Sequence, residues 1–317
     1  MGLKGKNILI TGGTGFIGSH LVKKLIEEKC NIIVPYQSLN PKSFFFSENL
    51  DKQVILVQKD LKNFKRTIDV ITKCEIDIIF HLAAQSIVPT AFHNPLETLE
   101  TNIMGTANIL EASRLYGKVQ GIIVVSSDKA YGKITRVSET SPLSGTHPYE
   151  TSKAAADLIA TTYFMTYGLP TVVTRFGNVY GEGDLNFSRI IPGIMKSIVK
   201  NEGLILRSDG KYIRDYVYVG DVVDALILLA KNLRKNCGEA FNISSNENLS
   251  VIELIKKIEN IVGVKAKYRI LNTAINEIPI QSVDFKKIRK QLGWRPNNSL
   301  STTISQIYDW YRLYFRN

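Results

Sequence analysis

The sequence predicts an α/β protein with a doubly wound, Rossmann-type parallel sheet and a smaller C-terminal substrate-binding domain. Short β-branched runs alternate with helix-like segments along the first 180 or so of its 317 residues, which indicates right-handed β–α–β crossovers. These runs are apolar almost without interruption, as in strands that helices cover on both faces. A glycine-rich stretch directly follows the first run, where a doubly wound fold makes its first tight turn.

The predicted elements of this first part follow one another in a regular order. A helix after the first strand places Ile17, Leu21 and Leu25 on one apolar face. A second long helix begins at Pro95 and ends at Gly117, and these residue types favour helix starts and helix ends. The predicted strands cover residues 6–11, 31–34, 54–57, 76–82, 119–127 and 171–176.

After about residue 180 the alternation becomes less regular. The sequence predicts a loop over 181–187, a helix over 188–200 and a charged loop over 207–215. Two further helices are expected over 222–233 and 302–315. The sequence contains no internal repeat and no low-complexity tract, so we expect one compact unit whose C-terminal part is a smaller cap.

Composition and charge exclude several classes of function. The 40 Lys and Arg residues outnumber the 29 Asp and Glu residues, which gives a net charge of +11. The basic residues are spread along helical stretches beside acids and form no block with aromatic residues, so we expect a solvated surface that attracts small anions and not nucleic acid. Three scattered cysteines without a CxxC pair favour neither a disulfide framework nor a metal site. No apolar run is long enough to span a membrane, and the opening MGLKGK lacks the layout of a signal peptide, so a cytoplasmic protein is expected.

The glycine-rich stretch has the properties of a dinucleotide-binding loop. TGGTGFIG lies between the first strand and the first helix, with glycines at Gly12, Gly15 and Gly18. Glycine lets backbone N–H groups approach a pyrophosphate closely, and the helix N-terminus adds partial positive charge. The alternative is a plain tight turn, but the strand, loop and amphipathic helix stand in the order that dinucleotide binding requires.

A tyrosine and a lysine four residues apart form the candidate catalytic pair. Tyr149 and Lys153 fall on one face of a helix, where the ammonium group favours the phenolate form of the tyrosine. A free phenol has a pKa of about 10, so it needs this stabilisation, together with that of a positive nicotinamide ring, to act as a base. Ser127 lies at the carboxyl end of a predicted strand, where doubly wound folds bind ligands. The alternatives are an ordinary helix surface for the pair and loop capping for Ser126 and Ser127.

The glycine spacing and the YxxxK pair resemble the extended branch of the short-chain dehydrogenase/reductase superfamily, in its NAD-dependent epimerase/dehydratase family. The resemblance implies that Ser127 hydrogen-bonds the hydroxyl group of the substrate. After the second strand this sequence departs from the family, because VPYQSLNP offers no acid for the adenosine ribose and no arginine for a 2′-phosphate. Uncharged groups at this place favour NAD, and NADP stays open. The hydroxyl and amide groups of Tyr36, Ser38 and Asn40 are the predicted contacts for an uncharged ribose. The resemblance places the cofactor against Gly12, Gly15, Phe16, Ile17, Gly18, Asp60, Leu61, Leu82, Ala83, Ala84, Asn102, Tyr149 and Lys153.

The residues after Ser127 resemble those of the nucleotide-sugar 4,6-dehydratases, and among these the CDP-glucose 4,6-dehydratases. Asp128 and Lys129 follow the serine, and the fragments HLAAQS and GNVYGEGDLNFSRIIP agree with this branch. The resemblance implies oxidation at carbon 4 of a nucleotide sugar, elimination of water across carbons 5 and 6, and hydride return to carbon 6, which gives a 4-keto-6-deoxy sugar. Asp128 is then the candidate acid and Lys129, in its neutral form, the candidate base at carbon 5. The alternative is that both are solvated turn residues.

Two other functions stay open at this point. An epimerase or oxidoreductase for a related sugar, such as a UDP-N-acetylhexosamine derivative, could use Asp128 and Lys129 for proton exchange at carbon 5. A non-catalytic dinucleotide sensor could share the fold, although the complete set of Ser127, Tyr149 and Lys153 argues against it. The stretch RSDGKYIRDYVYVGD resembles the general epimerase/dehydratase pattern, so the nucleotide base and the sugar are not assigned.

The resemblance also implies a domain organisation, an assembly and a set of substrate contacts. A dinucleotide-binding domain is expected over 1–180, with the chain returning to it around 215–243, and a mainly nucleotide-sugar-binding domain over 181–317. Family members often dimerise through the helices that correspond to 95–117 and 150–168, so a homodimer or homotetramer is expected. For Arg214 the alternative is a surface salt bridge with Asp215. The predicted substrate-binding residues are Ser86, Asn178, Arg189 and Arg214.

Overall fold

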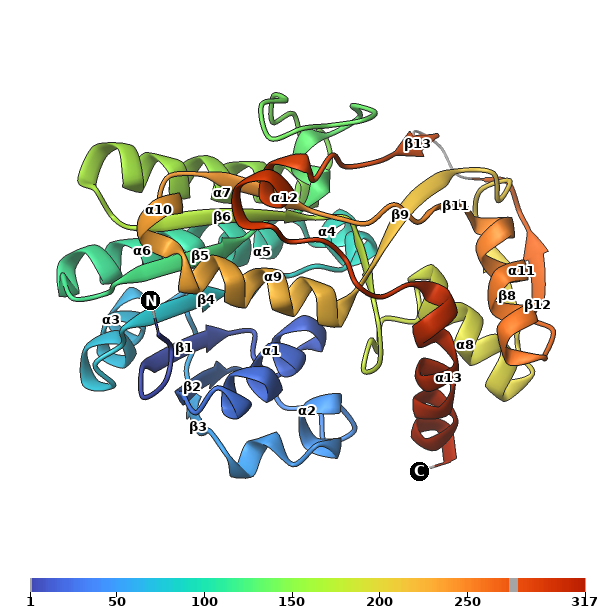
Figure 1. Ribbon diagram of the computed structural model, residues 1–317, viewed down its shortest axis with the longest axis horizontal. Coiled ribbons are helices and arrows are strands. Elements are labelled where there is room, and N and C mark those ends of the chain that lie inside the picture. The colour runs from blue at the N-terminus through green and yellow to red at the C-terminus, as the bar shows by residue number, and fades with distance from the viewer. Residues whose placement is uncertain (1, 274–278, 317) are drawn as a thin grey trace. The chain divides into compact units, whose positions relative to one another are not determined.

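The computed structural model of the protein describes residues 2–273 and 279–316. Its first compact unit contains a seven-stranded sheet in which the neighbouring strands from β3 to β6 are parallel (Figure 1). The spatial order β10-β6-β5-β4-β1-β2-β3 contains the strand order of doubly wound dinucleotide-binding folds, which confirms the predicted fold class. The strands are β1 (Asn7–Thr11), β2 (Asn31–Tyr36), β3 (Ile55–Gln58), β4 (Ile78–His81), β5 (Gly121–Val125), β6 (Thr171–Phe176) and β10 (Ala240–Ile243).

Helices cover both faces of this sheet, because its strands are apolar on both faces. On one face α3, α6 and α7 form a core with the strand residues Leu9, Ile79 and Ile122. On the other face α1 lies beside α9, where Lys231 forms an ion pair with Glu28 (Figure 1). None of the described helices is both long and apolar enough to cross a membrane. The helical elements here are α1 (Phe16–Glu27), α2 (Phe44–Ser47), η1 (Leu50–Lys52), α3 (Phe64–Lys73), α4 (Val88–His93), α5 (Pro95–Leu99), η2 (Glu100–Met104), α6 (Gly105–Tyr116), η3 (Asp128–Tyr131), α7 (Pro148–Tyr167), α9 (Val219–Lys231) and α10 (Leu233–Asn236).

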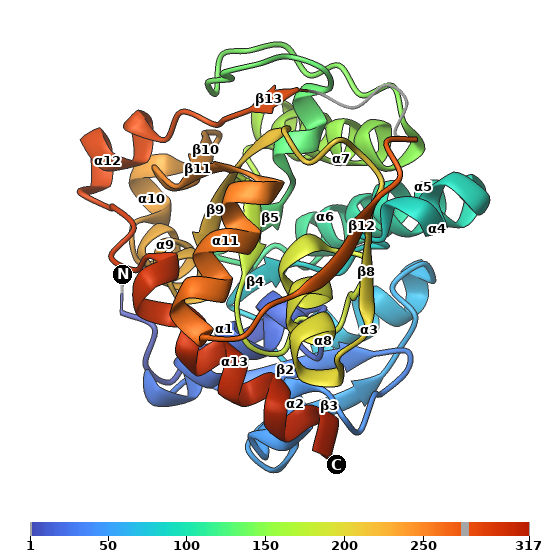
Figure 2. The ribbon, with the colours of Figure 1, turned by 90° about the vertical axis from the view of Figure 1, so that its right-hand side faces the viewer.

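The chain forms a second compact unit from Lys133–Ser138, Gly177–Val222 and the residues from Ile243 onward, while the remainder forms the first. Helices α8, α11 and α13 share an apolar core in this unit, and Figure 2 shows them side by side. Strand β9 pairs with β7, β11 and β13, and β12 pairs with β8. The elements are β7 (Asn178–Tyr180), α8 (Ile190–Lys200), β8 (Gly203–Leu206), β9 (Ile213–Tyr218), β11 (Asn248–Ser250), α11 (Val251–Val262), β12 (Lys267–Ile270), β13 (Ile280–Gln281), α12 (Lys286–Leu292) and α13 (Leu300–Arg316).

Two predicted elements differ from the structure. The charged loop predicted over 207–215 is wrong at its end, because β9 begins at Ile213. The partner strands of β9 come from distant parts of the sequence, so local sequence does not reveal where its backbone hydrogen bonds are made. The helix predicted from Pro95 to Gly117 has these ends, but a π-helical turn, η2, separates α5 from α6. Such turns are frequent at functional sites, and this one contains Asn102.

Candidate active site

The glycine-rich loop joins β1 to α1 and has no room for a larger side chain at two positions. Gly12 has a φ of +70°, and a Cβ atom there would lie 2.9 Å from the backbone nitrogen of Ala83. A Cβ atom on Gly18 would collide with the carbonyl oxygen of Gly12. The loop therefore presents bare backbone at the N-terminus of α1, which fits the pyrophosphate of a dinucleotide. Gly15 is the N-cap of α1, and Phe16 and Ile17 are its first residues.

A carboxylate lies beside the end of β2, although β2 itself supplies none. Gln37 directly follows β2, and its Nε2 atom donates a hydrogen bond of 2.7 Å to Oδ1 of Asp60, which lies beyond the end of β3. Sequence reasoning missed Gln37, because only the pairing of β2 with β3 brings this residue to Asp60. Of the other predicted residues here, Tyr36 is half-buried, Ser38 and Asn40 are exposed, and Leu61 packs against the apolar core.

Thr11, at the end of β1, connects the start of the glycine-rich loop to the end of β4 through its hydroxyl group. Its hydroxyl accepts a hydrogen bond of 3.1 Å from the backbone nitrogen of Ala83 and lies 2.8 Å from Nδ1 of His81. Nε2 of His81 lies 3.0 Å from the hydroxyl of Thr106, so threonine hydroxyls engage both ring nitrogens. Burial lowers the pKa of His81 to about 3, so the ring is neutral and has a packing role. Leu82 and Ala84 flank Ala83 in this stretch.

Asn102 joins the segment after β4 to helix α7. Its Oδ1 atom accepts a hydrogen bond of 2.7 Å from the backbone of Gln85, and its Nδ2 atom donates to the carbonyl oxygen of Gln85 at 3.1 Å. Nδ2 also donates to the hydroxyl of Ser152 at 2.8 Å. Asn102 is buried, so these bonds fix the loop against the helix that contains Tyr149 and Lys153. Ser86, next to Gln85, is exposed.

Tyr149 and Lys153 lie on the first turns of α7. A capping box of His147 and Glu150 begins this helix, and Tyr149 is its second residue, where the helix dipole favours negative charge. Lys153 is buried, and its Nζ atom donates a hydrogen bond of 2.9 Å to the carbonyl oxygen of Val125. Burial lowers the pKa of Lys153 to about 8, and the carboxylate of Asp157 partly offsets this effect. The ammonium group is thus held at the carboxyl end of β5.

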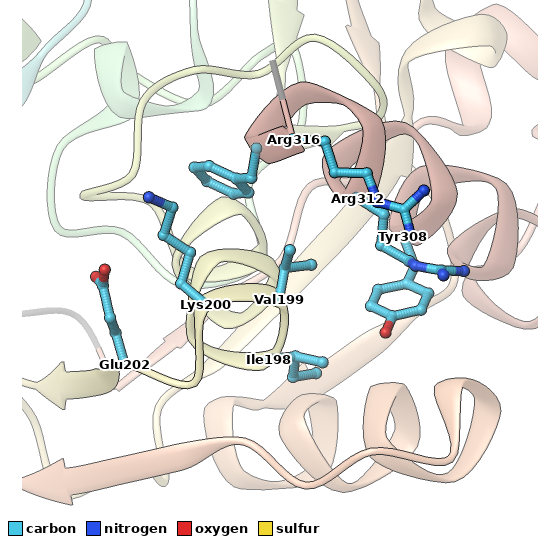
Figure 3. Close-up of a pocket in the computed structure, with 8 residues that line it drawn as sticks. Ile198, Val199, Lys200, Glu202, Tyr308, Arg312 and Arg316 are labelled. Atoms are coloured by element: carbon cyan, nitrogen blue, oxygen red, sulfur yellow. The ribbon is translucent and has the colours of Figure 1, made fainter.

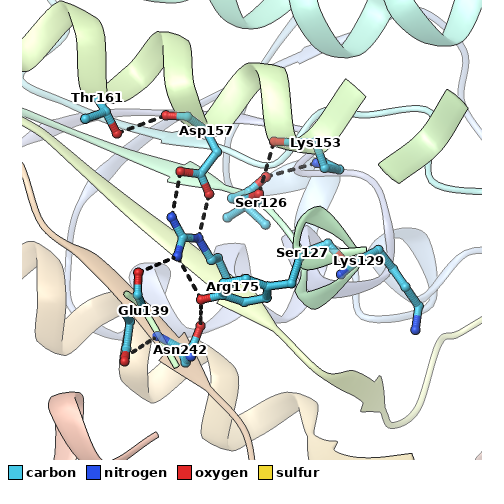
Figure 4. A network of polar contacts seen from close by, with 11 residues as sticks. Ser126, Ser127, Lys129, Glu139, Lys153, Asp157, Thr161, Arg175 and Asn242 are labelled. Atoms are coloured by element: carbon cyan, nitrogen blue, oxygen red, sulfur yellow. Dashed lines mark hydrogen bonds and ion pairs between the residues drawn. The ribbon is translucent and has the colours of Figure 1, made fainter. Parts of the chain in front are cut away.

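Ser127, Asp128 and Lys129 form the turn that follows β5. Figure 4 shows Ser127 and Lys129 in this turn. The Ser127 hydroxyl accepts a hydrogen bond of 3.2 Å from the backbone of Lys129 and donates one of 3.0 Å to Oδ1 of Asp128. The Asp128 side chain is only 4% exposed, so it is not the solvated turn residue of the alternative interpretation. Among the described residues its Oδ2 atom accepts no hydrogen bond, and Nζ of Lys129 lies 3.6 Å from it. A buried carboxyl group with one unsatisfied oxygen is typical of a functional site.

The three remaining predicted residues belong to the second unit. Nδ2 of Asn178 donates to the carbonyl oxygen of Asp215 at 3.2 Å. Nη1 of Arg189 pairs with Oδ2 of Asp184 at 2.6 Å, and Nη1 of Arg214 donates to the carbonyl oxygen of Ile213 at 2.8 Å.

Arg189 and Arg214 both lie near enough to Tyr216 for their charges to act on its phenol. Burial raises the pKa of the Tyr216 phenol, and the charges of Arg214 and Arg189 both oppose this rise. Asp215 is buried and accepts a hydrogen bond from Ser244, so it is not the surface residue of the alternative interpretation.

A separate hollow of about 530 Å³ lies between α8 and α13 in the second unit (Figure 3). Arg312 and Arg316 contribute positive charge to it, beside the rings of Tyr308 and Phe315. None of the predicted site residues lines this hollow. It is therefore a surface groove apart from the residues that the sequence singled out.

Comparison with known proteins identifies the family. The sequence model described as GDP-mannose 4,6 dehydratase matches residues 9–307. The chain belongs to this family. It is 32% identical to a putative UDP-glucose 4-epimerase of Methanocaldococcus jannaschii (96% of this chain, 97% of the relative) and 30% identical to a dTDP-glucose 4,6-dehydratase of Neisseria meningitidis (96% and 93%). The solved structure of a dTDP-glucose 4,6-dehydratase from Streptomyces venezuelae, which contains NAD, matches 97% of each chain with a TM-score of 0.88 and 28% identity.

Membership of the GDP-mannose 4,6 dehydratase family confirms the predicted resemblance to nucleotide-sugar 4,6-dehydratases. A CDP-glucose 4,6-dehydratase of Salmonella typhimurium is also similar, with 28% identity, 99% of this chain and 92% of the relative. Relatives named for dTDP-glucose and for epimerisation match at a comparable level. The family is thereby established, while the nucleotide and the outcome of the reaction depend on the site itself.

Proposed function

We propose that this member of the family is an NAD-dependent nucleotide-sugar 4,6-dehydratase that produces a 4-keto-6-deoxy sugar. The observation that carries the proposal is the buried carboxyl group of Asp128, hydrogen-bonded to Ser127 and 3.6 Å from the ammonium of Lys129. Oxidation at carbon 4 alone needs only a base for the hydroxyl proton. Loss of water also needs an acid at carbon 6 and a base at carbon 5, and this turn supplies both chemical groups.

Each side chain has a distinct task in this reaction. Bound NAD would take a hydride from carbon 4 of the sugar and return it to carbon 6. Tyr149 removes the proton of the carbon 4 hydroxyl, which Ser127 orients by a hydrogen bond. The buried ammonium of Lys153 stabilises the phenolate. Once carbon 4 is a ketone, Lys129 takes the acidified proton from carbon 5 and Asp128 protonates the departing hydroxyl of carbon 6, so that water leaves. When the hydride reaches carbon 6, the ammonium of Lys129 returns a proton to carbon 5.

The Asp128–Lys129 pair can reach the required protonation state without any proton from solvent. Transfer of one proton from the ammonium of Lys129 to the carboxylate of Asp128 converts the ion pair into a neutral acid and a neutral base. Elimination then returns the ion pair, because the acid gives up its proton and the base gains one. The two groups lie 3.6 Å apart, so this exchange needs a small shift of the Lys129 side chain that brings them within hydrogen-bond distance.

The cofactor and the nucleotide are expected to occupy different units. The loop from Gly12 to Gly18 fits the pyrophosphate of NAD, and a similar structure contains NAD. The Asp60 carboxylate beside Gln37 disfavours the extra phosphate of NADP by like-charge repulsion. Arg189 and Arg214 would bind the diphosphate of the nucleotide sugar, which supports a substrate role for the second unit.

A product-mass assay tests the dehydratase proposal directly. The purified protein is incubated with NAD and, separately, with CDP-, UDP-, dTDP- and GDP-hexoses, and the product masses are measured. We expect the loss of one water from at least one of these sugars and no net consumption of NAD. Turnover without a change in mass contradicts the proposal.

A nucleotide-sugar epimerase is the second candidate, and the similarity to the putative UDP-glucose 4-epimerase of M. jannaschii favours it. Its product would have the mass of the substrate and an inverted stereocentre. If Asp128 and Lys129 exchange the proton at carbon 5, a reaction in heavy water incorporates one deuterium at that carbon. The product-mass assay therefore separates the two candidates in one measurement.

We also propose that two copies of the chain associate through α6 and α7. These helices expose large apolar side chains, namely Leu115 (52%), Leu158 (56%) and Met165 (74%). Exposed apolar patches of this kind are typical of interfaces. Light scattering on the purified protein is expected to give at least twice the mass of one chain, and Leu158→Glu is expected to reduce it to that of one chain. A cytoplasmic location also stays a prediction.

A further inference from the structure

A buried arginine in the first unit connects two segments that contain candidate catalytic residues (Figure 4). Arg175 lies on β6, and its side chain is only 7% exposed. Its Nε and Nη2 atoms donate to the two carboxylate oxygens of Asp157 at 2.7 and 2.9 Å. Its Nη1 atom donates to the hydroxyl of Tyr131 at 2.7 Å and to the carbonyl oxygen of Glu139 at 3.2 Å. All three guanidinium nitrogens are thus hydrogen-bonded.

A second group of hydrogen bonds extends this network. The Tyr131 hydroxyl donates to Oδ1 of Asn242 at 2.7 Å, and the backbone nitrogen of Asn242 donates to Oε1 of Glu139 at 2.9 Å. The guanidinium carbon of Arg175 lies 4.9 Å from the centre of the Tyr131 ring. Tyr131 is fully buried, so the loss of any of these partners leaves a polar group without water to replace it.

The network lies close to four points at which the chain leaves or re-enters the first unit. Glu139 and Asn242 are the residues at two of these boundaries, and Tyr131 and Arg175 each lie one residue before the last residue of the first unit at the other two. After Phe176 the chain continues into β7, which pairs with β9, and β10 itself extends to Ile243. The side-chain hydrogen bonds of the network therefore add to strand pairing as a constraint on these segments.

Two residues of the network, Asp157 and Tyr131, belong to the segments that contain the candidate catalytic residues. Asp157 lies one helical turn after Lys153 on α7, and its charge partly offsets the lowered pKa of that lysine. Tyr131 is the last residue of η3, the turn that begins at Asp128 and contains Lys129. Arg175 is therefore a side chain that contacts both the helix of the oxidation step and the turn of the elimination step.

We propose that Arg175 is a positioning residue that fixes the position of the Asp128–Lys129 turn relative to the helix that contains Tyr149 and Lys153. The inference rests on the proposed dehydratase function, in which both pairs act on neighbouring carbons of one bound sugar. A lysine at this position could not make these contacts, because its single ammonium lacks the planar fork that binds a carboxylate at two points and a phenol at a third. Displacement of a catalytic group by about 1 Å can reduce a rate by roughly a hundredfold.

The proposal differs from a purely structural ion pair in its effect on the two chemical steps. A structural pair would lower the amount of folded protein and reduce oxidation and water loss by the same factor. Loosening only η3, which begins after Ser127, leaves Ser127, Tyr149 and Lys153 in place, so oxidation continues while elimination slows. Reduced nicotinamide then accumulates during turnover, and its absorbance reports the imbalance.

The test uses Tyr131→Phe, which removes one hydroxyl from the network and keeps the ring. Tyr163→Phe is the matched control, because Tyr163 lies on α7 and its hydroxyl donates a single bond of 3.2 Å to Glu111 outside the network. We expect Tyr131→Phe to slow water loss by about tenfold or more, to leave carbon 4 oxidation within roughly threefold, and to accumulate reduced cofactor. The control is expected to behave as the unmodified protein does. Equal losses in both steps, or no loss in either, would overturn the proposal.

Hydrogen exchange on the protein without added ligands provides a readout that does not need turnover. We expect faster exchange of the backbone amides of residues 128–132 in Tyr131→Phe and unchanged exchange in Tyr163→Phe. If the unmodified protein releases water from none of the tested sugars, the dehydratase function fails, and this measurement alone decides whether Arg175 holds the turn. Unchanged exchange over 128–132 in Tyr131→Phe refutes the positioning role whatever the reaction is.

Discussion

Replacement of Lys153 by methionine is expected to abolish activity and to stabilise the protein at neutral pH. The ordinary pKa of the side chain is 10.5, and burial lowers it to about 8. A difference of one pKa unit corresponds to about 1.4 kcal/mol, so the charged form of Lys153 costs the folded state roughly 3 kcal/mol. Lys153→Met removes this cost but also loses the hydrogen bond to the carbonyl oxygen of Val125, which is worth about 1 kcal/mol. The net expectation is a gain of roughly 2 kcal/mol.

The pH dependence of this gain follows from the direction of the pKa change. Below pH 8 the lysine is charged in both the folded and the unfolded chain, so the folded state bears the whole cost of burial. Between pH 8 and 10.5 the folded protein loses the proton first, and the cost decreases with each step in pH. The stabilisation by Lys153→Met should therefore be complete at pH 7 and should decrease steadily above pH 8.

Urea unfolding of both proteins at pH 7 and pH 10 measures the effect, and thermal unfolding at pH 7 should show a rise in Tm of about 5 °C. Lys73→Met is the matched control, because its side chain is 73% exposed and its ion pair with Asp69 lies at the protein surface. That control is expected to change stability by less than about 1 kcal/mol. A Lys153→Met protein that is less stable than the original at pH 7, or equally stabilised at pH 7 and 10, refutes the reasoning.

Three further substitutions test individual residues. Tyr149→Phe should abolish carbon 4 oxidation, with a loss of about a thousandfold or more, and leave the dissociation constant for NAD within about twofold by calorimetry; full activity would remove Tyr149 as the base. Asp128→Asn should slow water loss by at least about a hundredfold while oxidation persists, and an unchanged rate of water release would contradict the dehydratase mechanism. Arg214→Ala should raise KM for the nucleotide sugar about tenfold at nearly constant kcat, since it removes a phosphate contact; an unchanged KM would place Arg214 outside the substrate site.

The parts of the site that depend on local sequence were predictable. The glycine-rich loop is an example, because a turn between a strand and a helix needs particular residues at particular positions. The structure shows why, since Gly12 adopts a positive φ and Gly18 lies against the carbonyl of Gly12. The spacing of Tyr149 and Lys153 is also local, because two residues four apart on a helix lie on one face whatever surrounds them.

The parts that depend on strand pairing and burial were not predictable from sequence. Gln37 reaches Asp60 only because β2 and β3 are neighbours in the sheet, so the carboxylate missing after β2 is supplied from the end of β3. The burial of Asp128 is also a tertiary property, because Ser-Asp-Lys in a turn is as compatible with solvent as with a site. The Asp157–Arg175 pair could have been suspected from one signal, an acid four residues after the candidate catalytic lysine, Lys153, on the same helix.

The proposed reaction needs Lys153 in its charged form and Lys129 in its neutral form. Lys153 must stay charged, yet it is buried; the carbonyl of Val125 and the carboxylate of Asp157 are the groups that retain the charge. Lys129 must become neutral, and it lies 3.6 Å from the carboxylate of Asp128, the group that would accept its proton. A sugar bound over this pair would exclude water and make two separate charges more costly than a neutral acid and a neutral base. Substrate binding would then drive proton transfer from Lys129 to Asp128, so the neutral acid and the neutral base would form only when the sugar is bound.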